Sequence, residues 1–541
     1  MIGARLSFKH LSIKRLFSAR LPRQAALAGL GAMLPVLLAG AILPAASGPQ
    51  ALAHEPAISF ALPRSGRPDL SADDRARIKA VLEISSADRG AGAQAFEAMP
   101  GGAATVPRPA GLKHGMAANL GVEDGQRFHL GEALFAKLWV SAPSSTQASD
   151  GLGPFYNARS CATCHVGGGG GVAVEAGEAP PSLILRLGRA AQTPDETAAL
   201  ASGKALTFDD PTYGHQLQTA AVPGLKREGG LQLRFETRSV TLSGGREVVL
   251  RKPKAEIVDL GYGPLDPRTQ LSLRIAQPLT GLSLIEAIHP DDILALAEAE
   301  PRQGVSGRPA LLRDPANGAA VLGRFGWKAQ APSLKAQAAD AFSNDIGIST
   351  PLQPDSHGDC TEAEQACRKA PDGVQARFGR FEAQEDVLDL VAFYAGHLAP
   401  SSRPLAQKPQ VLAGKALFAT MGCAACHHPN FVTRRDAADP ADAFQLIWPY
   451  SDFLLHDMGE DLFGGHPVGL AGPQDWRTPP LWGIGRRMAY KSVGAFLHDG
   501  RARTPEDAVL WHGGEGEGAR KAYIAATDKD RADLLAFLES L

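Results

Sequence analysis

The sequence has little cysteine, few aromatic residues and no excess of positive charge. Cysteine occurs 6 times in 541 residues, and Phe, Trp and Tyr together make up 6% of the chain. The 55 Lys and Arg residues are balanced by 57 Asp and Glu residues, which gives a formal net charge of −2. Because nucleic acids are bound by clustered positive charge, we expect no nucleic-acid partner. The length is sufficient for two or more domains with substantial cores.

Long apolar runs are absent except near the N-terminus. Six basic residues within the first 23 positions precede an apolar run over residues 25–46, which has no acidic residue. This order is typical of a secretory signal, and Ala51-Leu-Ala53 offers small residues for cleavage. The alternative, an uncleaved membrane anchor, is weakened by the prolines and glycines of the run. We therefore predict a signal peptide over residues 1–53, export to the bacterial periplasm, and no stable membrane span after cleavage.

The few cysteines are concentrated in a repeated Cys-x-x-Cys-His pattern. The cysteines of the two copies are Cys161, Cys164, Cys423 and Cys426, and the histidines are His165 and His427. This pattern is typical of c-type haem attachment, in which the thiols form thioethers to the porphyrin and the histidine is the proximal iron ligand. A redox disulfide, half of a zinc site and chance are the alternatives, but neither copy has a second Cys-x-x-Cys nearby. We predict two covalently attached c-type haems.

The two remaining cysteines, Cys360 and Cys367, enclose a six-residue segment. An oxidising compartment outside the cytoplasm would allow them to form a disulfide. The sequence does not fix the geometry that such a bond requires. The bridge is therefore expected but not required by the pattern.

Two further repeats frame the cysteine patterns. Gly-x-Ala-Leu-Phe-Ala occurs at Gly131–Ala136 and Gly414–Ala419, and Asp-Leu-x-Ala-Phe occurs at Asp389–Phe393 and Asp533–Phe537. Each segment has apolar residues at helical spacing. A helix, the cysteine pattern and a closing helix with an aromatic residue are the plan of a cytochrome c-like domain. Their repetition indicates an internal duplication.

We therefore predict a mainly α fold with two cytochrome c-like haem domains. The first occupies residues 131–400, the second residues 406–541, and residues 54–130 form an N-terminal extension. The first domain must contain insertions. One of them, Leu231–Leu260, alternates apolar and polar residues around Gly244-Gly245, which predicts a small β-hairpin.

The second axial position of each iron decides between electron transfer and reactivity. The residues that could occupy it are His215, His289, His357, His397, His428, His456, His466, His498, His512, Met421, Met458 and Met488. A single histidine or methionine is more often packed or solvated than bound to a metal. Residue type alone therefore does not select a ligand.

A resemblance narrows the choice. It rests on the segments Tyr213–Gln218, Gly323–Lys328, Tyr450–Gly459, Trp476–Trp482 and Phe496–Arg501. They are similar to the bacterial di-haem oxidoreductase (putative peroxidase) family, which is related to the di-haem cytochrome c peroxidases. The peroxidases carry a distal methionine fourteen residues after a His-Asp/Asn-Gly turn, and the same count from His498 leads to His512. The resemblance thus implies that His427 and His512 bracket the second iron, with Met458 as the rival ligand.

The resemblance also implies a catalytic residue. Peroxidases place a glutamine and a glutamate of one short segment over the reactive first haem, and the match here is Gln277 and Glu286. A carboxylate in this position could take a proton from peroxide and return it; the alternative for Glu286 is a solvated helix residue. Trp327 and Trp482 are candidates for an aromatic side chain between the haems, although large aromatic residues are more often core residues.

Two classes of function are consistent with these features. One is a peroxidase-like oxidoreductase, in which the second haem supplies electrons to a reactive first haem that acts on a peroxide-type substrate. The other is a di-haem electron carrier without bond-making chemistry. The large first domain favours the enzyme. Either protein would exchange electrons with a small redox protein or another electron donor or acceptor.

Overall fold

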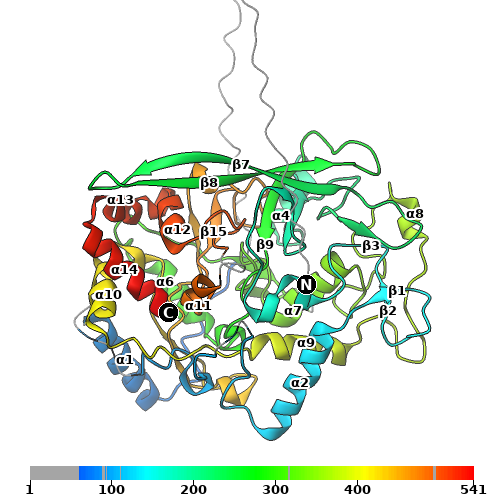
Figure 1. Ribbon diagram of the computed structural model, residues 1–541. Helices are drawn as coiled ribbons and strands as arrows, with labels where there is room; N and C mark the ends of the chain where they lie inside the picture. The colour runs from blue at the N-terminus through cyan, green and yellow to red at the C-terminus, as the bar shows by residue number, and fades with distance from the viewer. Residues whose placement is uncertain are drawn as a thin grey trace, which may run out of the picture. The chain divides into compact units, whose positions relative to one another are not determined.

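Short helices and strands alternate along the chain, and no single sheet dominates (Figure 1). The structure is a computed structural model that describes residues 60–87, 92, 94, 96–109, 111, 113–314, 317–490 and 495–541. The predicted signal peptide, residues 1–53, lies outside the described residues. Residues 55–541 form one compact unit, and its predicted division into an extension and two haem domains stays a prediction. Within the described ranges, every helix is too short or too polar to cross a bilayer.

The helices range from single turns to four turns. They are α1 (Ala72–Ala87), α2 (Val122–Ala136), α3 (Cys161–Cys164), α4 (Pro194–Ala201), α5 (Leu282–Glu286), α6 (Pro290–Glu298), α7 (Leu334–Ala341), α8 (Gln365–Arg368), α9 (Glu385–Gly396), α10 (Pro409–Thr420), α11 (Ile484–Ala489), α12 (Pro505–Trp511), α13 (Glu517–Ala525) and α14 (Asp528–Ser540). The predicted framing helices are confirmed: α2 packs against α9, and α10 packs against α14.

Most strands are very short. They are β1 (Val140–Ser141), β2 (Asp150–Leu152), β3 (Phe155–Tyr156), β4 (Gly177–Glu178), β5 (Leu183–Gly188), β6 (Ala220–Ala221), β7 (Gly230–Thr241), β8 (Glu247–Val258), β9 (Gln270–Ile275), β10 (Leu311–Arg313), β11 (Ala320–Leu322), β12 (Phe431–Val432), β13 (Leu446–Ile447), β14 (Leu455–Asp457) and β15 (Asp475–Arg477). They form small sheets, of which β4-β7-β8 and β5-β9 matter most for the site.

The prediction of a mainly α fold is wrong. Helices hold 32% of the residues and strands 17%, so the fold is mixed. The predicted hairpin is confirmed as β7 and β8, which pair antiparallel from Gly230 opposite Val258 to Thr241 opposite Glu247. Most other strands span only two or three residues, and alternation over so few positions gives no recognisable signal.

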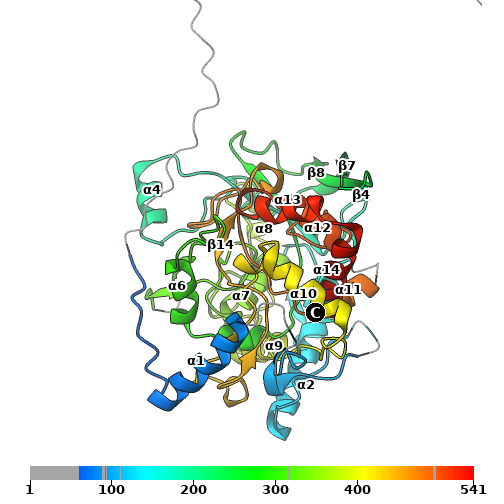
Figure 2. The same ribbon diagram turned by 90° about the vertical axis from the view of Figure 1, so that its left-hand side faces the viewer.

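The hairpin joins the two halves of the sequence. In Figures 1 and 2 it extends along one side of the structure, past α12 and α13. Leu242, Val248 and Leu250 near its turn belong to the same buried cluster as Trp511 and Tyr523 from the C-terminal helices. An insertion of the first half therefore covers the core of the second half.

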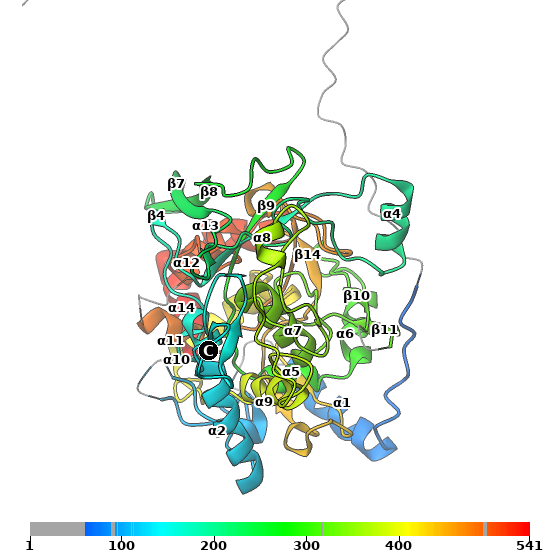
Figure 3. The ribbon, with the colours of Figure 1, turned by 90° about the vertical axis from the view of Figure 1, so that its right-hand side faces the viewer.

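A second set of contacts surrounds α7. This helix lies beside α9 and α5 (Figure 3), and it continues into a turn of π-helix at Phe342–Ile346. Phe342 and Ile346 are buried in the cluster that also holds Phe135 of α2 and Tyr394 of α9. The polar face of α7 is thereby left facing the interior space described below.

The predicted disulfide between Cys360 and Cys367 is also formed.

The N-terminal segment is tied to the second half by a buried cluster of charges. Glu97 is 1% exposed and accepts hydrogen bonds from Arg403, Lys415 and the Tyr450 hydroxyl at 2.8, 2.6 and 2.6 Å. Burial alone would raise the pKa of Glu97, but the charges of Arg403 and Lys415 outweigh it and lower the pKa to about 2. The carboxylate is therefore ionised at neutral pH and compensates two buried cations.

We expect Glu97→Ala to lower the free energy of unfolding by about 3–5 kcal/mol, because it leaves the charges of Arg403 and Lys415 buried without a counter-ion. Since folding lowers this pKa, the stabilisation is present at neutral pH and is lost as the pH falls from about 4.5 through about 2. Urea unfolding of Glu97→Ala and wild type at several pH values measures both effects.

The matched control is Glu178→Ala, which removes an exposed glutamate from β4. It should change the free energy of unfolding by less than about 0.5 kcal/mol. Equal losses in the two variants would contradict the role of the buried cluster.

Candidate functional site

Both Cys-x-x-Cys-His patterns are seated by a close helix crossing. α2 crosses α9 at Gly131, where an added Cβ would lie 2.2 Å from the carbonyl oxygen of Leu390. α10 crosses α14 at Gly414, where an added Cβ would lie 1.9 Å from the carbonyl oxygen of Asp533. Only glycine permits such an approach without displacing the neighbouring helix. The repeated Gly-x-Ala-Leu-Phe-Ala segment thus builds the same support twice.

A phenylalanine one turn after each glycine faces the histidine of the pattern. The ring centroids of Phe135 and His165 are 6.1 Å apart, and those of Phe418 and His427 are also 6.1 Å apart. Each phenylalanine in addition meets an aromatic ring of the closing helix, at 5.1 Å for Tyr394 and at 5.2 Å for Phe537. These contacts restrict how the two histidine rings can lie.

Three half-buried histidines that line the cavities described below share one hydrogen-bonding arrangement, which the buried His397 also makes with Phe393. The distances from Nδ1 to a backbone carbonyl oxygen are 2.9 Å from His165 to Gln277, 2.9 Å from His427 to Tyr450 and 2.6 Å from His512 to Ala508. A carbonyl oxygen can only accept, so Nδ1 carries the hydrogen and Nε2 keeps its lone pair. Metal-binding histidines are oriented in this way. By this criterion His512 matches the two histidines of the patterns.

Burial sets the protonation of these groups. It lowers the pKa of His165 and of His427 to about 4, so both rings are neutral at pH 7 and can act as ligands. Burial also raises the pKa of Cys161 and of Cys423 to about 12. The thiols therefore lack the thiolate character of a reactive redox pair. No cluster of three or more potential metal-binding side chains occurs in the described part of the chain.

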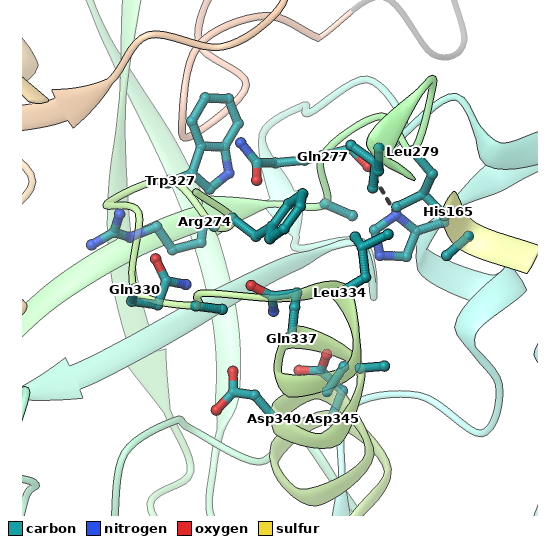
Figure 4. A pocket seen from close by; sticks show the side chains of 18 of the residues that line it. His165, Arg274, Gln277, Leu279, Trp327, Gln330, Leu334, Gln337, Asp340 and Asp345 are labelled. Atoms are coloured by element: carbon teal, nitrogen blue, oxygen red, sulfur yellow. Dashed lines mark hydrogen bonds between the residues drawn. The ribbon is translucent and has the colours of Figure 1, made fainter. Parts of the chain in front are cut away.

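A cavity of about 490 Å³ adjoins the first pattern. Cys161, Cys164 and His165 line it together with residues of β5, β9 and α7. Figure 4 shows Gln337 and Asp340 projecting from α7, and it shows Arg274 and Trp327 on the side of the cavity remote from His165. The volume lies within the usual range of about 300–1,000 Å³ for small-molecule and cofactor sites.

A second cavity of about 210 Å³ adjoins the second pattern. Cys423, Cys426 and His427 line it, and so do His512 and Met458. This second cavity is smaller than the first, and its lining is mostly apolar. The structure therefore brings the predicted ligand His512 and its rival Met458 to the same cavity as His427.

The candidate axial residues divide into three groups. His215 and His466 line the first cavity, and His456, His498, His512 and Met458 line the second. The others, His289, His357, His397, His428, Met421 and Met488, are not among the residues that line either of these two cavities. Of the two candidate bridging aromatics, Trp327 lines both cavities and Trp482 only the first.

Glu286 is not brought to the wall of the first cavity. Its Oε1 accepts a hydrogen bond from the backbone N–H of Leu334, the first residue of α7, at 3.1 Å. Burial raises the pKa of this carboxyl. The carboxylate thus supports the start of the helix that carries Gln337 and Asp340, and its predicted catalytic role stays a prediction.

The acids that do line the first cavity are Asp340 and Asp345, which the sequence analysis missed. Asp345 Oδ1 accepts a hydrogen bond from Gln216 at 2.8 Å, and burial raises the pKa of this carboxyl. Its charge also acts on the thiols of Cys161 and Cys164. The signal in the sequence was the recurrence of polar residues at Gln337, Asp340 and Asp345, three and five positions apart. This segment lies far from the cysteine pattern along the chain and so was not connected with it.

A second residue that could not be assigned from sequence is His456. It is 1% exposed, and its two ring nitrogens lie 2.9 Å from Asp452 Oδ2 and 2.7 Å from Glu515 Oε2. Although burial opposes protonation, these carboxylates raise the pKa of His456 to about 12. His456 is therefore an imidazolium at neutral pH, which lacks the free lone pair of an iron ligand.

The site thus combines two thiols, a neutral histidine with a free Nε2 and an adjoining cavity, and it does so twice. Residues 224–541 match the protein family described as "Di-haem oxidoreductase, putative peroxidase". The chain belongs to this family, which implies two haems. No curated protein matches the chain.

Among solved structures, the chain is similar to the crystal structure of the diheme peroxidase BthA from Burkholderia thailandensis E264. Its sequence is 18% identical, and the alignment covers 56% of this chain and 92% of that chain with a TM-score of 0.25. At this score the likeness carries no argument about the arrangement of the fold.

The residues present fit two haems. Each cavity has two thiols for attachment and a histidine whose free Nε2 can meet an iron. The first cavity has sufficient volume for a cofactor. For the smaller second cavity, the fit rests on the available ligands, which include the two histidines His427 and His512 from different segments. These features agree with the family.

We expect His512→Ala to convert the second haem from low spin to high spin, because the ring nitrogen opposite His427 is lost while both thiols remain. Electron paramagnetic resonance of the ferric protein measures this change, and haem content should be unaltered. Met458→Ala is the matched control and should keep the low-spin signal. A spin change in Met458→Ala but not in His512→Ala would make the assignment wrong.

Proposed function

We propose that the chain is an exported, periplasmic di-haem oxidoreductase with peroxidase-like activity, in which electrons pass from the second haem to the first. The observation that carries this proposal is the difference between the two cavities. The second is small and has a histidine on each of two segments, whereas the first is more than twice as large and is lined by many more charged and amide side chains. A plain electron carrier would not need this additional polar space.

Each haem would be held by the cysteines and the histidine of one pattern. Cys161, Cys164 and His165 would hold the first, and Cys423, Cys426 and His427 the second, with His512 as a further ligand. When bound, c-type haem supplies one-electron redox chemistry and an iron that can react with peroxide. The carbonyls of Gln277 and Tyr450 hold the two proximal imidazoles in the tautomer that presents Nε2.

Asp345 is our candidate for the group that holds and moves a proton in the first cavity. Oδ1 is occupied by the hydrogen bond from Gln216, and Oδ2 accepts no hydrogen bond from any residue in the described ranges, so it can carry a proton. Because burial raises the pKa of this carboxyl, its proton is held nearer to neutral pH than that of an exposed aspartate. Glu286, held by Leu334, is the alternative.

Trp327 would lie on the route between the two centres. Its side chain lines both cavities, and its Nε1 donates a hydrogen bond to the carbonyl oxygen of Ile275 at 2.8 Å. This bond fixes the ring in one orientation. A small redox protein or another donor would supply electrons to the second half of the chain, and a peroxide-type molecule would be the substrate.

We expect the intact mass of the protein purified from the periplasm to exceed that of the polypeptide by two haems. Mass spectrometry measures the excess. Replacement of Cys161 and Cys164 by serine should remove one haem, and replacement of Cys423 and Cys426 should remove the other. A mass that corresponds to one haem or none in the wild type would overturn the proposal.

We expect Asp345→Asn to lower peroxide turnover by roughly 10²–10⁴-fold, the usual contribution of general acid–base catalysis, without loss of haem. Asparagine keeps the Oδ1 acceptor for Gln216 but cannot carry the proton. Peroxide-dependent oxidation of a dye measures the rate, and Asp195→Asn, an exposed aspartate of α4, is the control. If Glu286→Gln lowers the rate more than Asp345→Asn does, Glu286 is the proton-transfer residue instead.

A further inference from the structure

The first cavity carries an excess of positive charge. Its walls include seven Arg and Lys side chains but only two carboxylates, those of Asp340 and Asp345. The basic residues are Arg186, Arg274, Arg313, Arg324, Lys328, Arg477 and Arg487. This excess occurs in a chain whose formal net charge is −2, so it is local and does not follow from composition.

Most of these side chains have partners in the fold. Four of them donate hydrogen bonds to backbone carbonyls, namely Arg313, Arg324, Arg477 and Arg487. Lys328 donates to the carbonyls of Gly472 and Asp475 at 2.6 and 2.8 Å. Arg186 and Arg274 differ, because each has a buried guanidinium nitrogen without a hydrogen-bond partner, although the Arg274 guanidinium also lies over the Trp476 ring, 4.4 Å from its centroid.

Strand pairing places these two arginines on one surface. In the antiparallel pair β5-β9, Arg186 is opposite Ser272 and Ile184 is opposite Arg274. Residues two apart on a strand, and residues opposite each other, share a face of the sheet. Arg186 and Arg274 are therefore diagonal neighbours on the face that lines the cavity, while the other face packs in the core.

Three buried nitrogen atoms of side chains that line this wall have no hydrogen-bond partner among the described residues. Arg274 is 8% exposed and makes no ion pair with any described residue, and its Nε has no hydrogen-bond partner. Arg186 pairs with Asp340 at 3.2 Å, but its Nη1 has no partner. His466 is fully buried, and its Nδ1 also lacks one, while its Nε2 lies 3.1 Å from Thr207 Oγ1.

Buried cations without counter-ions are strongly unfavourable. The effect is visible here, since burial and then the charge of Arg186 lower the pKa of Arg274 to about 9. Two arginines and a histidine directed at one space are the arrangement by which proteins hold a planar oxyanion, because guanidinium groups match its oxygens in pairs. Much of the remaining lining, such as Leu279 and Pro480, is apolar.

We propose that Arg186, Arg274 and His466 form a carboxylate-binding site on the wall of the first cavity. An apolar body carrying the carboxylate would lie against the aliphatic part of the lining. Two sources could supply the group: a propionate of the haem attached at Cys161 and Cys164, or a separate carboxylate-bearing substrate. The first source rests on the proposed function, whereas the second does not.

The test uses the purified holoprotein and the variants Arg274→Gln and His466→Gln, with Arg268→Gln, an exposed arginine paired with Asp266, as the matched control. Sodium benzoate is the probe, and sodium chloride at equal ionic strength and inorganic phosphate are the comparison anions. Benzoate binding is followed by difference spectra and by the midpoint of thermal unfolding. A redox titration without added anions gives the midpoint potentials of both haems.

If the site holds a propionate, one midpoint potential shifts in both variants but not in Arg268→Gln, and benzoate has no effect on the wild type. If it holds a separate carboxylate, benzoate binds the wild type saturably and at least tenfold more weakly to both variants, while the potentials stay unchanged. Either result supports the site and identifies the source.

Unchanged potentials together with no benzoate binding to the wild type would overturn the proposal. A saturable response to phosphate but not to benzoate would overturn the assignment to carboxylates. Should Arg274→Gln fail to fold, Arg274→Lys and His466→Gln provide the same comparison. Thermal unfolding detects benzoate binding whether or not haem is attached. The mass measurement therefore tests the proposed function independently of the carboxylate site.

Discussion

The hydrogen bond between Nδ1 of the histidine in each cysteine pattern and a backbone carbonyl oxygen is the constraint on which both centres depend. It selects one tautomer and leaves Nε2 free, which neither the cysteines nor the adjoining helices can do. The two carbonyls come from outside the cysteine patterns, because Gln277 follows His165 by 112 residues and Tyr450 follows His427 by 23 residues. Much of the surrounding fold therefore serves to bring two peptide groups to their places.

The two carbonyls are held by different means. Gln277 follows β9, whose pairing with β5 fixes the position of the strand end. Tyr450 adopts a φ of +53°, which a residue other than glycine rarely takes. Its ring is held by Phe418 and by the hydrogen bond to Glu97. The N-terminal segment thus contributes to the second centre through a buried charge cluster, although none of its residues lines the second cavity.

The elements predictable from the sequence were those with a long or repeated signal. The framing helices and the hairpin are of this kind. The role of His512 as an iron ligand stays a prediction, although the structure brings it to the same cavity as His427. The fold class was wrong because many strands are too short to show alternation. The side-chain direction of Glu286 and the meeting of Arg186 with Arg274 could not be foreseen, since both depend on how distant segments pair. Likewise, only packing reveals that His456 lies between two carboxylates and is protonated.

Some structural features of the haem sites occur in both halves of the chain, whereas others occur only in the first half. The glycine crossing, the phenylalanine contact and the Nδ1 hydrogen bond occur in both halves, and they orient the histidine of each pattern. The wall that carries Arg186 and Arg274, by contrast, is formed by β5 and β9, whereas the strands beside the second cavity are β14 and β15, which contribute His456, Trp476 and Arg477. Because β5 and β9 lie outside the repeated helices, their cavity-facing residues can change without disturbing the crossing that seats the cysteine pattern. The helix crossing that seats the cysteine pattern and the side chains that face the first cavity are therefore carried by separate parts of the chain, although the pairing of β5 with β9 also places the Gln277 carbonyl that orients His165.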